Sequence, residues 1–176
     1  LLPGARWGVR MGDAPIVDFV TGALHDPFGR MHMGVTAENV AAKHGITREM
    51  QDELAAESHR RAARAVAEGR FAGQIVPVDV PSRKGPVQFT VDEHFRADTS
   101  VEQLAKMKPV FKKDGGSVTA GNASGLNDGA GAVMLASGAA VGRLGLKPMA
   151  RLVAYAHAGV EPELMGLGPV PATQLA

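Results

Sequence analysis

The sequence predicts a soluble α/β protein, and three observations lead to that prediction. Residues 47–68 have the composition of one long amphipathic helix. Residues 75–91 contain two short segments that alternate apolar and polar side chains, the pattern of a β-hairpin. Residues 117–137 place a glycine-rich, small-residue centre between two short apolar runs. That pattern predicts a strand, a tight turn, a short helix and a second strand.

Two helices are expected ahead of the long one. Asp13 can cap a helix over residues 13–24, whose apolar side chains fall on one stripe. Thr36 is expected to cap a second helix that continues to His44. Gly45 should end this helix, because glycine adopts the left-handed backbone conformation of a helix C-terminus without steric cost.

The long helix and the hairpin follow. Thr47 supplies a helix cap and Gly69 a stop, and acidic residues precede basic ones along the helix, as its dipole favours. Strands are expected over residues 75–80 and 87–91, with Gly85 in the turn between them. A ribbon this short needs a helix to pack on.

The remaining elements are shorter. Ser100 is expected to cap a helix through Lys106. Residues 138–146 should form another helix, and residues 149–156 a strand. Residues 164–171 are expected to form a Gly/Pro loop that leads into a last helix.

The composition limits the classes of function. Of 176 residues, 45% are apolar and 21% charged, and the net charge of +1 gives no indication of nucleic acid or an anionic membrane as a partner. The absence of cysteine excludes disulfides, thiolate metal sites and a cysteine nucleophile from this chain. We expect a cytoplasmic protein without a bound metal. The start at Leu1, without a methionine or a signal peptide pattern, suggests a fragment.

Residues 121–125 are the strongest candidate for contact with a ligand. Ser124 is expected near the N-terminus of a helix, where free N–H groups and the helix dipole favour an oxygen-rich ligand. A plain cap on a tightly packed helix is the alternative. His32, between Met31 and Met33, is suited to line a flexible apolar ligand or to serve as a structural histidine. The residue types alone leave both alternatives open.

Three long phrases closely resemble sequences of the thiolases, the family of acetyl-CoA acyltransferases. They occur in the order and spacing of that family, and the resemblance runs along nearly the whole chain. The phrases are HMGVTAENVA at residues 32–41, NASGLNDGA at residues 122–130 and MGLGPVPA at residues 165–172.

The resemblance implies a thiolase-like α/β fold with α-β-α-β-α layers, of which this chain would hold the inserted loop domain and parts of the two core halves. Residues 1–108 would form the loop domain that covers coenzyme A. Residues 109–146 would be the end of the N-terminal half, and residues 147–176 the start of the C-terminal half.

The resemblance also implies a coenzyme A site. His32 and Met33 would lie beside the pantetheine and acyl end, and Ser124 would contact the pantetheine amide. Arg96 would lie against the adenine nucleotide and Met165 over the reactive pocket. The full set of implied contacts, which includes three wall residues, is Leu24, His32, Met33, Arg96, Phe111, Ala120, Ser124 and Met165.

The implied activity is acyl transfer between acyl-CoA and acetyl-CoA, by Claisen condensation and its thiolytic reverse. Thiolases use a cysteine nucleophile, the histidine of a GHP phrase and a second cysteine in a CxGGG phrase, and this chain has none of them, nor the NEAF phrase. The chain would therefore supply coenzyme A binding but not the nucleophile, and would be inactive alone. Another departure is Gln103, where many relatives have a serine. A non-catalytic coenzyme-A-binding or assembly module is the alternative.

Further expectations follow from the family. Coenzyme A and acyl-CoA would be substrates, with no permanently bound cofactor, and neither nucleic acid nor a membrane would be a partner. The parent protein is expected to form a homodimer or homotetramer. The HMG phrase at residues 32–34 resembles biosynthetic and broad-range short-chain members. Roles in fatty acid metabolism and in the synthesis of polyhydroxybutyrate precursors are therefore expected.

Overall fold

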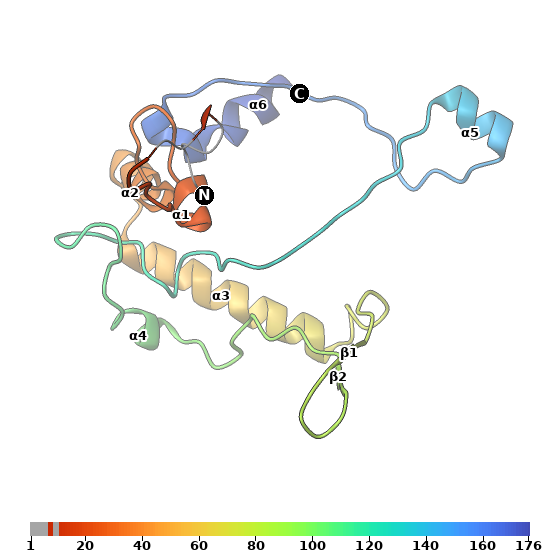
Figure 1. Ribbon diagram of the computed structural model, residues 1–176, viewed down its shortest axis with the longest axis horizontal. Coiled ribbons are helices and arrows are strands. Elements are labelled where there is room, and N and C mark those ends of the chain that lie inside the picture. Colours follow the sequence, from red (N-terminus) through yellow and green to blue (C-terminus); the bar gives the residue numbers. More distant parts are fainter. Residues whose placement is uncertain (1–6, 9–10) are drawn as a thin grey trace.

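The computed structural model describes residues 7–8 and 11–176, and the long helix α3 is its central element (Figure 1). Helices α1 and α2 lie at one end of α3, and the β-hairpin lies at the other end. The helical elements are α1 (Phe19–Ala23), α2 (Met33–His44), α3 (Arg48–Ala67), α4 (Val101–Leu104), α5 (Gly138–Leu144), the 3-10 helix η2 (Pro162–Leu167) and α6 (Pro169–Leu175). Leu1 lies outside the described residues.

The helix caps predicted at Thr47 for α3 and at Ser100 for α4 are confirmed. The Thr47 hydroxyl accepts a hydrogen bond from the N–H of Met50, and Gly69, just past the end of α3, has a φ of 69°. Ser100 and Gln103 form a capping box on α4, in which each side chain accepts a hydrogen bond from the backbone N–H of the other residue. Each of these N-terminal caps is formed by bonds between residues three positions apart in the sequence.

Helix α2 begins earlier than predicted. His32 is its cap, because its Nδ1 accepts a hydrogen bond from the N–H of Gly34 at 3.0 Å. Thr36 lies inside the first turn, where its hydroxyl donates to the carbonyl of Met33. The predicted cap at Thr36 is therefore wrong, and an imidazole nitrogen takes the place of a hydroxyl. Gly45 ends the helix with a φ of 64°, as predicted.

Helix α1 is shorter than predicted. Residues 13–18 form no helix, and Asp13 caps nothing. The carboxylate of Asp18 instead accepts a hydrogen bond from the N–H of Thr21 at 2.8 Å, which starts the helix five residues later than expected. A single amphipathic stripe does not extend a helix where no neighbouring element covers it.

The hairpin has the predicted antiparallel pairing but shorter strands. Strand β1 (Val78–Val80) pairs with β2 (Val87–Phe89), with Val78 opposite Phe89. Every residue of both strands is exposed.

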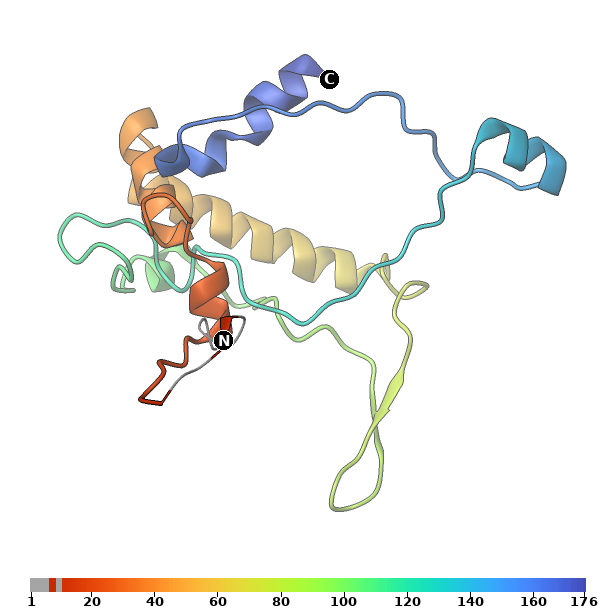
Figure 2. The same ribbon diagram turned by 45° about the horizontal axis from the view of Figure 1, so that its top comes forward.

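The strand–turn–helix–strand prediction for residues 117–137 is wrong except for the turn. Residues 126–137 form neither helix nor strand, and Val133, Met134 and Leu135 are between 87% and 90% exposed. The predicted strand over residues 149–156 is likewise irregular chain. A strand needs a neighbour for its backbone hydrogen bonds. Figures 1 and 2 show these stretches running out to α5 and back, away from α3.

The Gly/Pro stretch over residues 164–171 is helical and not the predicted loop. It forms the end of η2 and the start of α6, and η2 packs against α2 although the two are far apart in sequence. Pro169 lies in the first turn of α6, where its fixed φ favours a helix start and its missing N–H is not needed.

Little apolar surface is buried. Among the side chains that the structure describes, the buried apolar ones are Ala41, Leu104 and Val118. The accessible surface is 14715 Å², whereas a compact monomer of 18.3 kDa exposes roughly 8,100 Å². Much of the apolar side-chain surface of this chain is therefore exposed. None of the described helices has both the length and the apolar character needed to span a membrane.

The junction of α2 with residues 117–118 is polar. Glu38 is 8% exposed, and its carboxylate accepts hydrogen bonds at 2.8 Å from the N–H of Ser117, the hydroxyl of Ser117 and the N–H of Val118. Gln51 on α3 donates to the same Ser117 hydroxyl at 2.9 Å. Helices α2 and α3 therefore hold residues 117–118, which lead into the turn at residues 121–125.

Candidate functional site

A cavity of about 630 Å³ lies beside α3, and three of the predicted site residues line it: Arg96, Ala120 and Ser124. Gln103 lines it too. One wall comes from residues 120–125, a second from α4 and the turn after it, and a third from residues 93–99. The lining residues are His59, Glu93, His94, Arg96, Asp98, Thr99, Gln103, Leu104, Met107, Ala120, Gly121, Ala123, Ser124 and Gly125.

Ser124 reaches this cavity from a turn and not from a helix N-terminus. It is exposed, and no helix follows it, so the expected helix dipole behind its hydroxyl is wrong for this chain. Glycine and asparagine around it disfavour a helix, which no packed neighbour here compensates. The turn is held locally. The Asn122 side-chain oxygen accepts from the N–H of Thr119 at 2.8 Å, and the Thr119 hydroxyl accepts from the N–H of Gly121 at 3.2 Å.

Two histidines in this cavity were not predicted. The Nδ1 of His59 accepts a hydrogen bond from the backbone N–H of Arg96 at 3.1 Å, which ties α3 to residues 93–99. The ring of His94 lies against Gly125, where an added Cβ would be 2.2 Å from its Cε1. The sequence signal for this contact is the glycine itself, which permits the close approach.

The lining of the cavity is chemically mixed. The Arg96 guanidinium, the imidazoles and the Ser124 hydroxyl can hydrogen-bond phosphate or amide oxygens of a ligand. The carboxylates of Glu93 and Asp98 also line the cavity, so it is not uniformly positive. It therefore suits a long ligand with both anionic and neutral parts better than a bare anion.

A second group of predicted residues gathers at the start of α2. The ring of His32 stacks on Phe111, with ring centroids 4.6 Å apart and an interplanar angle of 24°. The N–H of Met33 donates to the carbonyl of Leu24 at 2.9 Å. Leu24, His32, Met33 and Phe111 are all partly exposed, so they form an accessible surface around the stack.

The loop before α2 is closed by hydrogen bonds to Asp26, and it leads directly into His32. The Asp26 carboxylate accepts hydrogen bonds from the N–H groups of Phe28, Gly29 and Met31 at 2.6–2.9 Å. The bond from Gly29 contributes most to holding the pKa of Asp26 below its ordinary value, although burial acts in the opposite direction. The loop thus closes around an ionised carboxylate.

Met165 does not line the 630 Å³ cavity. It is on η2 and 44% exposed. Its element is attached to α2, because the Asn39 amide donates to the carbonyl of Glu163 at 3.1 Å and Gly166 lies close to Val40.

Replacing Gly34 with alanine is expected to disrupt the His32–Phe111 stack. An added Cβ would lie 2.1–2.3 Å from three ring atoms of Phe111, an overlap that requires the ring to move. We expect a loss of about 1–3 kcal/mol in unfolding free energy and a change in the aromatic NMR signals of both rings. Ala37→Ser, an exposed change on the same helix, is the control. Unchanged ring signals in Gly34→Ala would contradict the contact.

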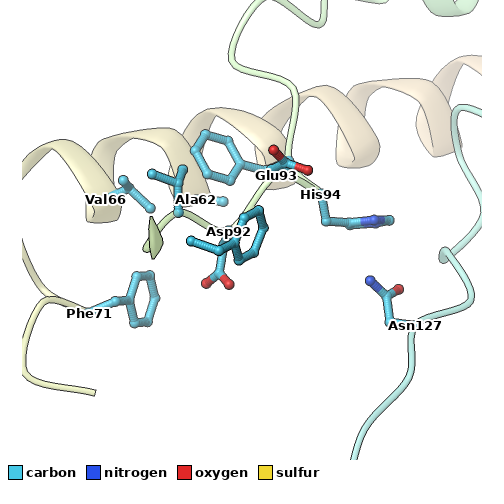
Figure 3. Close-up of a pocket in the computed structure, with 10 residues that line it drawn as sticks. Ala62, Val66, Phe71, Asp92, Glu93, His94 and Asn127 are labelled. Carbon is cyan, nitrogen blue, oxygen red and sulfur yellow. The ribbon is translucent and has the colours of Figure 1, made fainter. Parts of the chain in front are cut away.

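A second cavity, of about 740 Å³, lies at the C-terminal end of α3 (Figure 3). Ala62 and Val66 project from α3, with Phe71 nearby, while His94 and Asn127 lie on the opposite side. No predicted site residue lines it. It shares Glu93 and His94 with the 630 Å³ cavity, so the two adjoin.

Relatives of known sequence match the whole chain. The chain is 60% identical over its full length to the beta-ketothiolase BktB of Cupriavidus necator and 56% identical to an acetyl-CoA acetyltransferase of Pseudomonas aeruginosa. In each case it covers 45% of the relative, so it spans less than half of the curated proteins it matches.

Solved structures agree with the sequence relatives. The acetyl-CoA acetyltransferase of Bacillus anthracis superposes with a TM-score of 0.84 at 49% identity, over 97% of this chain and 43% of that one. Human mitochondrial 3-ketoacyl-CoA thiolase in complex with CoA superposes with a TM-score of 0.83 at 45% identity, over 97% of this chain and 42% of that one. The fold is therefore part of an α/β thiolase fold, as predicted.

The family itself is shown by a family model. The model described as "Thiolase, N-terminal domain" matches residues 2–139, which is most of the chain. Together with the relatives and the fold, this match shows that the chain belongs to the thiolase family.

Proposed function

We propose that this chain is the coenzyme-A-binding part of a thiolase that transfers acyl groups between acyl-CoA and acetyl-CoA. The observation that carries the proposal is the meeting of Arg96 with Ala120 and Ser124 in one 630 Å³ cavity, although Arg96 precedes the other two by more than 20 residues. A cavity of this volume is within the usual range for a small-molecule site.

In this proposal the residues divide the work of holding coenzyme A. Arg96 lies against the nucleotide and its phosphates, and its guanidinium is suited to charge-assisted hydrogen bonds with phosphate oxygens. Ser124 and Ala120 lie along the pantetheine arm. The surface formed by Leu24, His32, Met33 and Phe111 lies toward the acyl end, and Met165, on η2, lies over the reactive pocket. The nucleophile is supplied from outside these 176 residues.

The finer features belong to the same proposal. Residues 1–108 form the loop domain, residues 109–146 the end of the N-terminal half and residues 147–176 the start of the C-terminal half. The parent protein is a cytoplasmic homodimer or homotetramer that binds coenzyme A only as a substrate and holds no metal. It acts in fatty acid metabolism or in the synthesis of polyhydroxybutyrate precursors.

Replacing Ser124 with alanine tests the proposal. Because Ser124 is exposed and caps no helix, the melting temperature should not change. The affinity for coenzyme A should fall by about threefold to tenfold, the value of one neutral hydrogen bond. Titration calorimetry of the chain with coenzyme A measures both the affinity and its loss.

Ser137→Ala is the matched control for Ser124→Ala. The Ser137 hydroxyl accepts a hydrogen bond from the N–H of Ala140 and caps α5, far from the cavity. This variant should lower helicity without changing the affinity for coenzyme A. Equal affinities of Ser124→Ala and the unmodified chain would contradict the proposed contact.

The alternative function is that of a non-catalytic module that binds coenzyme A or promotes assembly. The absence of cysteine from this chain is the observation that favours it. Both functions predict binding of coenzyme A by this chain. They differ in the longer protein, where only a thiolase would form a covalent acyl intermediate with acetoacetyl-CoA. Mass spectrometry of that protein after brief mixing with the substrate separates the two.

A further inference from the structure

We propose that Arg48 and Asp52, an ion pair on α3, are positioning residues. They hold two walls of the 630 Å³ cavity, the end of α4 and the turn at residues 121–125, in fixed positions relative to each other. The inference rests on the proposed function of that cavity as the coenzyme A site. Neither residue lines the cavity, so each would act through the residues that do.

The ion pair is close and shielded from water. The Arg48 Nε lies 2.7 Å from the Asp52 Oδ2, and the side chains are 18% and 2% exposed. The two residues are one helical turn apart, so α3 sets their geometry without help from other segments. A shielded pair of this kind stabilises a fold weakly but constrains its geometry when its remaining donors and acceptors are satisfied.

The remaining donors of Arg48 reach the wall formed by α4. Its second guanidinium nitrogen donates to the carbonyl of Leu104 at 2.6 Å and to the carbonyl of Met107 at 3.1 Å. Leu104 and Met107 line the cavity, and Leu104 is 2% exposed. Arg48 therefore fixes the end of α4 and the turn after it.

The second oxygen of Asp52 reaches the opposite wall. Its Oδ1 accepts a hydrogen bond from the Asn122 amide at 2.9 Å, and the same amide donates to the carbonyl of Ser117. Asn122 begins the turn that places Ser124 at the cavity. The ion pair is thus the link from one wall to the other.

The two walls also touch each other. An added Cβ at Gly121 would lie 2.4 Å from Leu104 Cδ2 and 2.6 Å from Met107 Sδ, so the glycine lets the turn approach α4 closely. At this distance a shift of either wall displaces the other. A change at Asp52 should consequently alter the position of Ser124 without removing any contact of the ligand itself.

The experiment uses the complete 176-residue chain with Asp52→Asn, Asn122→Ala and the exposed control Glu53→Gln. Calorimetry with coenzyme A gives the affinity of folded molecules, at a temperature where circular dichroism shows α3 intact. Hydrogen exchange reports the protection of residues 119–125. We expect about tenfold weaker binding and faster exchange at residues 119–125 for the first two variants. Glu53→Gln should match the unmodified chain.

Two results would overturn the positioning role of Arg48 and Asp52. One is unchanged affinity together with unchanged exchange at residues 119–125. The other is a lower melting temperature with unchanged affinity of the folded molecules. If Asp52→Asn loses its helices, the affinity and exchange of Asn122→Ala test the inference instead, because that variant leaves the ion pair intact. If the unmodified chain does not bind coenzyme A, the proposed function fails instead. Exchange at residues 119–125 then decides the positioning role alone.

Discussion

Purified chain is expected to leave acetoacetyl-CoA uncleaved in the presence of coenzyme A. Thiolysis by this family proceeds through a thiolate that accepts the acyl group, and the chain contains no cysteine. Binding and hydrogen bonding alone cannot replace the missing covalent step, so the rate should equal that of buffer. The measurement is the disappearance of acetoacetyl-CoA over time.

A positive control is needed because a trace of intact enzyme would mimic activity. A full-length thiolase added at a known low concentration fixes the detection limit of the assay. Turnover above buffer, in a preparation free of full-length enzyme by mass spectrometry, would show that the nucleophile has been wrongly placed outside this chain.

Replacing Glu38 with glutamine is expected to produce the largest loss of stability. The carboxylate accepts hydrogen bonds from the two backbone N–H groups and one hydroxyl of Ser117 and Val118. Glutamine can keep one oxygen for the two backbone N–H groups, which both donate to Oε1, but it removes the negative charge and puts an NH₂ group where Oε2 accepts from the Ser117 hydroxyl and lies 3.0 Å from the Ser117 nitrogen. We expect a loss of about 3 kcal/mol, measured as the opening free energy of α2 and α3 amides by hydrogen exchange.

Glu53→Gln is the control for this change, since Glu53 is an exposed carboxylate on α3. Its opening free energies should stay within about 0.5 kcal/mol of those of the unmodified chain. An equally small effect of Glu38→Gln would mean that the polar junction does not hold α2 to residues 117–118.

The same carboxylate predicts a dependence on pH. Burial raises the pKa of Glu38, but hydrogen bonds from Val118 and Ser117, with the nearby charge of Lys112, bring it below the ordinary value of 4.5. A carboxyl with a lowered pKa in the folded state contributes stability that is present above about pH 4.5 and is lost as pH falls through the folded pKa. Stability should therefore fall less steeply below pH 4.5 in Glu38→Gln.

Some local helix caps are predicted correctly from the sequence, whereas the caps expected at Asp13 and Thr36 are wrong. Thr47, Ser100 and Gly45 act through bonds to residues a few positions away, and each occurs where predicted. The predicted strands at residues 133–135 and 149–156 are absent because a strand depends on a distant partner that periodicity does not identify.

In the candidate site, too, some features are predicted from the sequence and others depend on tertiary contacts. The thiolase resemblance pointed to Arg96, Ala120 and Ser124, which share a cavity, whereas the helix predicted after Ser124 from the residue pattern does not form in this chain. The Glu38–Ser117 junction joins residues 79 positions apart, and no local pattern marks it. The contact of His59 with the backbone of Arg96 also depends on tertiary structure, and no local pattern predicts it.

The scarcity of buried apolar side chains has a thermodynamic consequence. The heat capacity change of unfolding arises mainly from apolar surface newly exposed to water, and among the described residues the buried apolar side chains are those of Leu104, Val118 and Ala41. The chain should therefore unfold with a heat capacity change well below the roughly 12–15 cal/mol/K per residue of ordinary globular proteins. Its stability curve should be flat with temperature, and a calorimetric scan should show a broad, shallow transition.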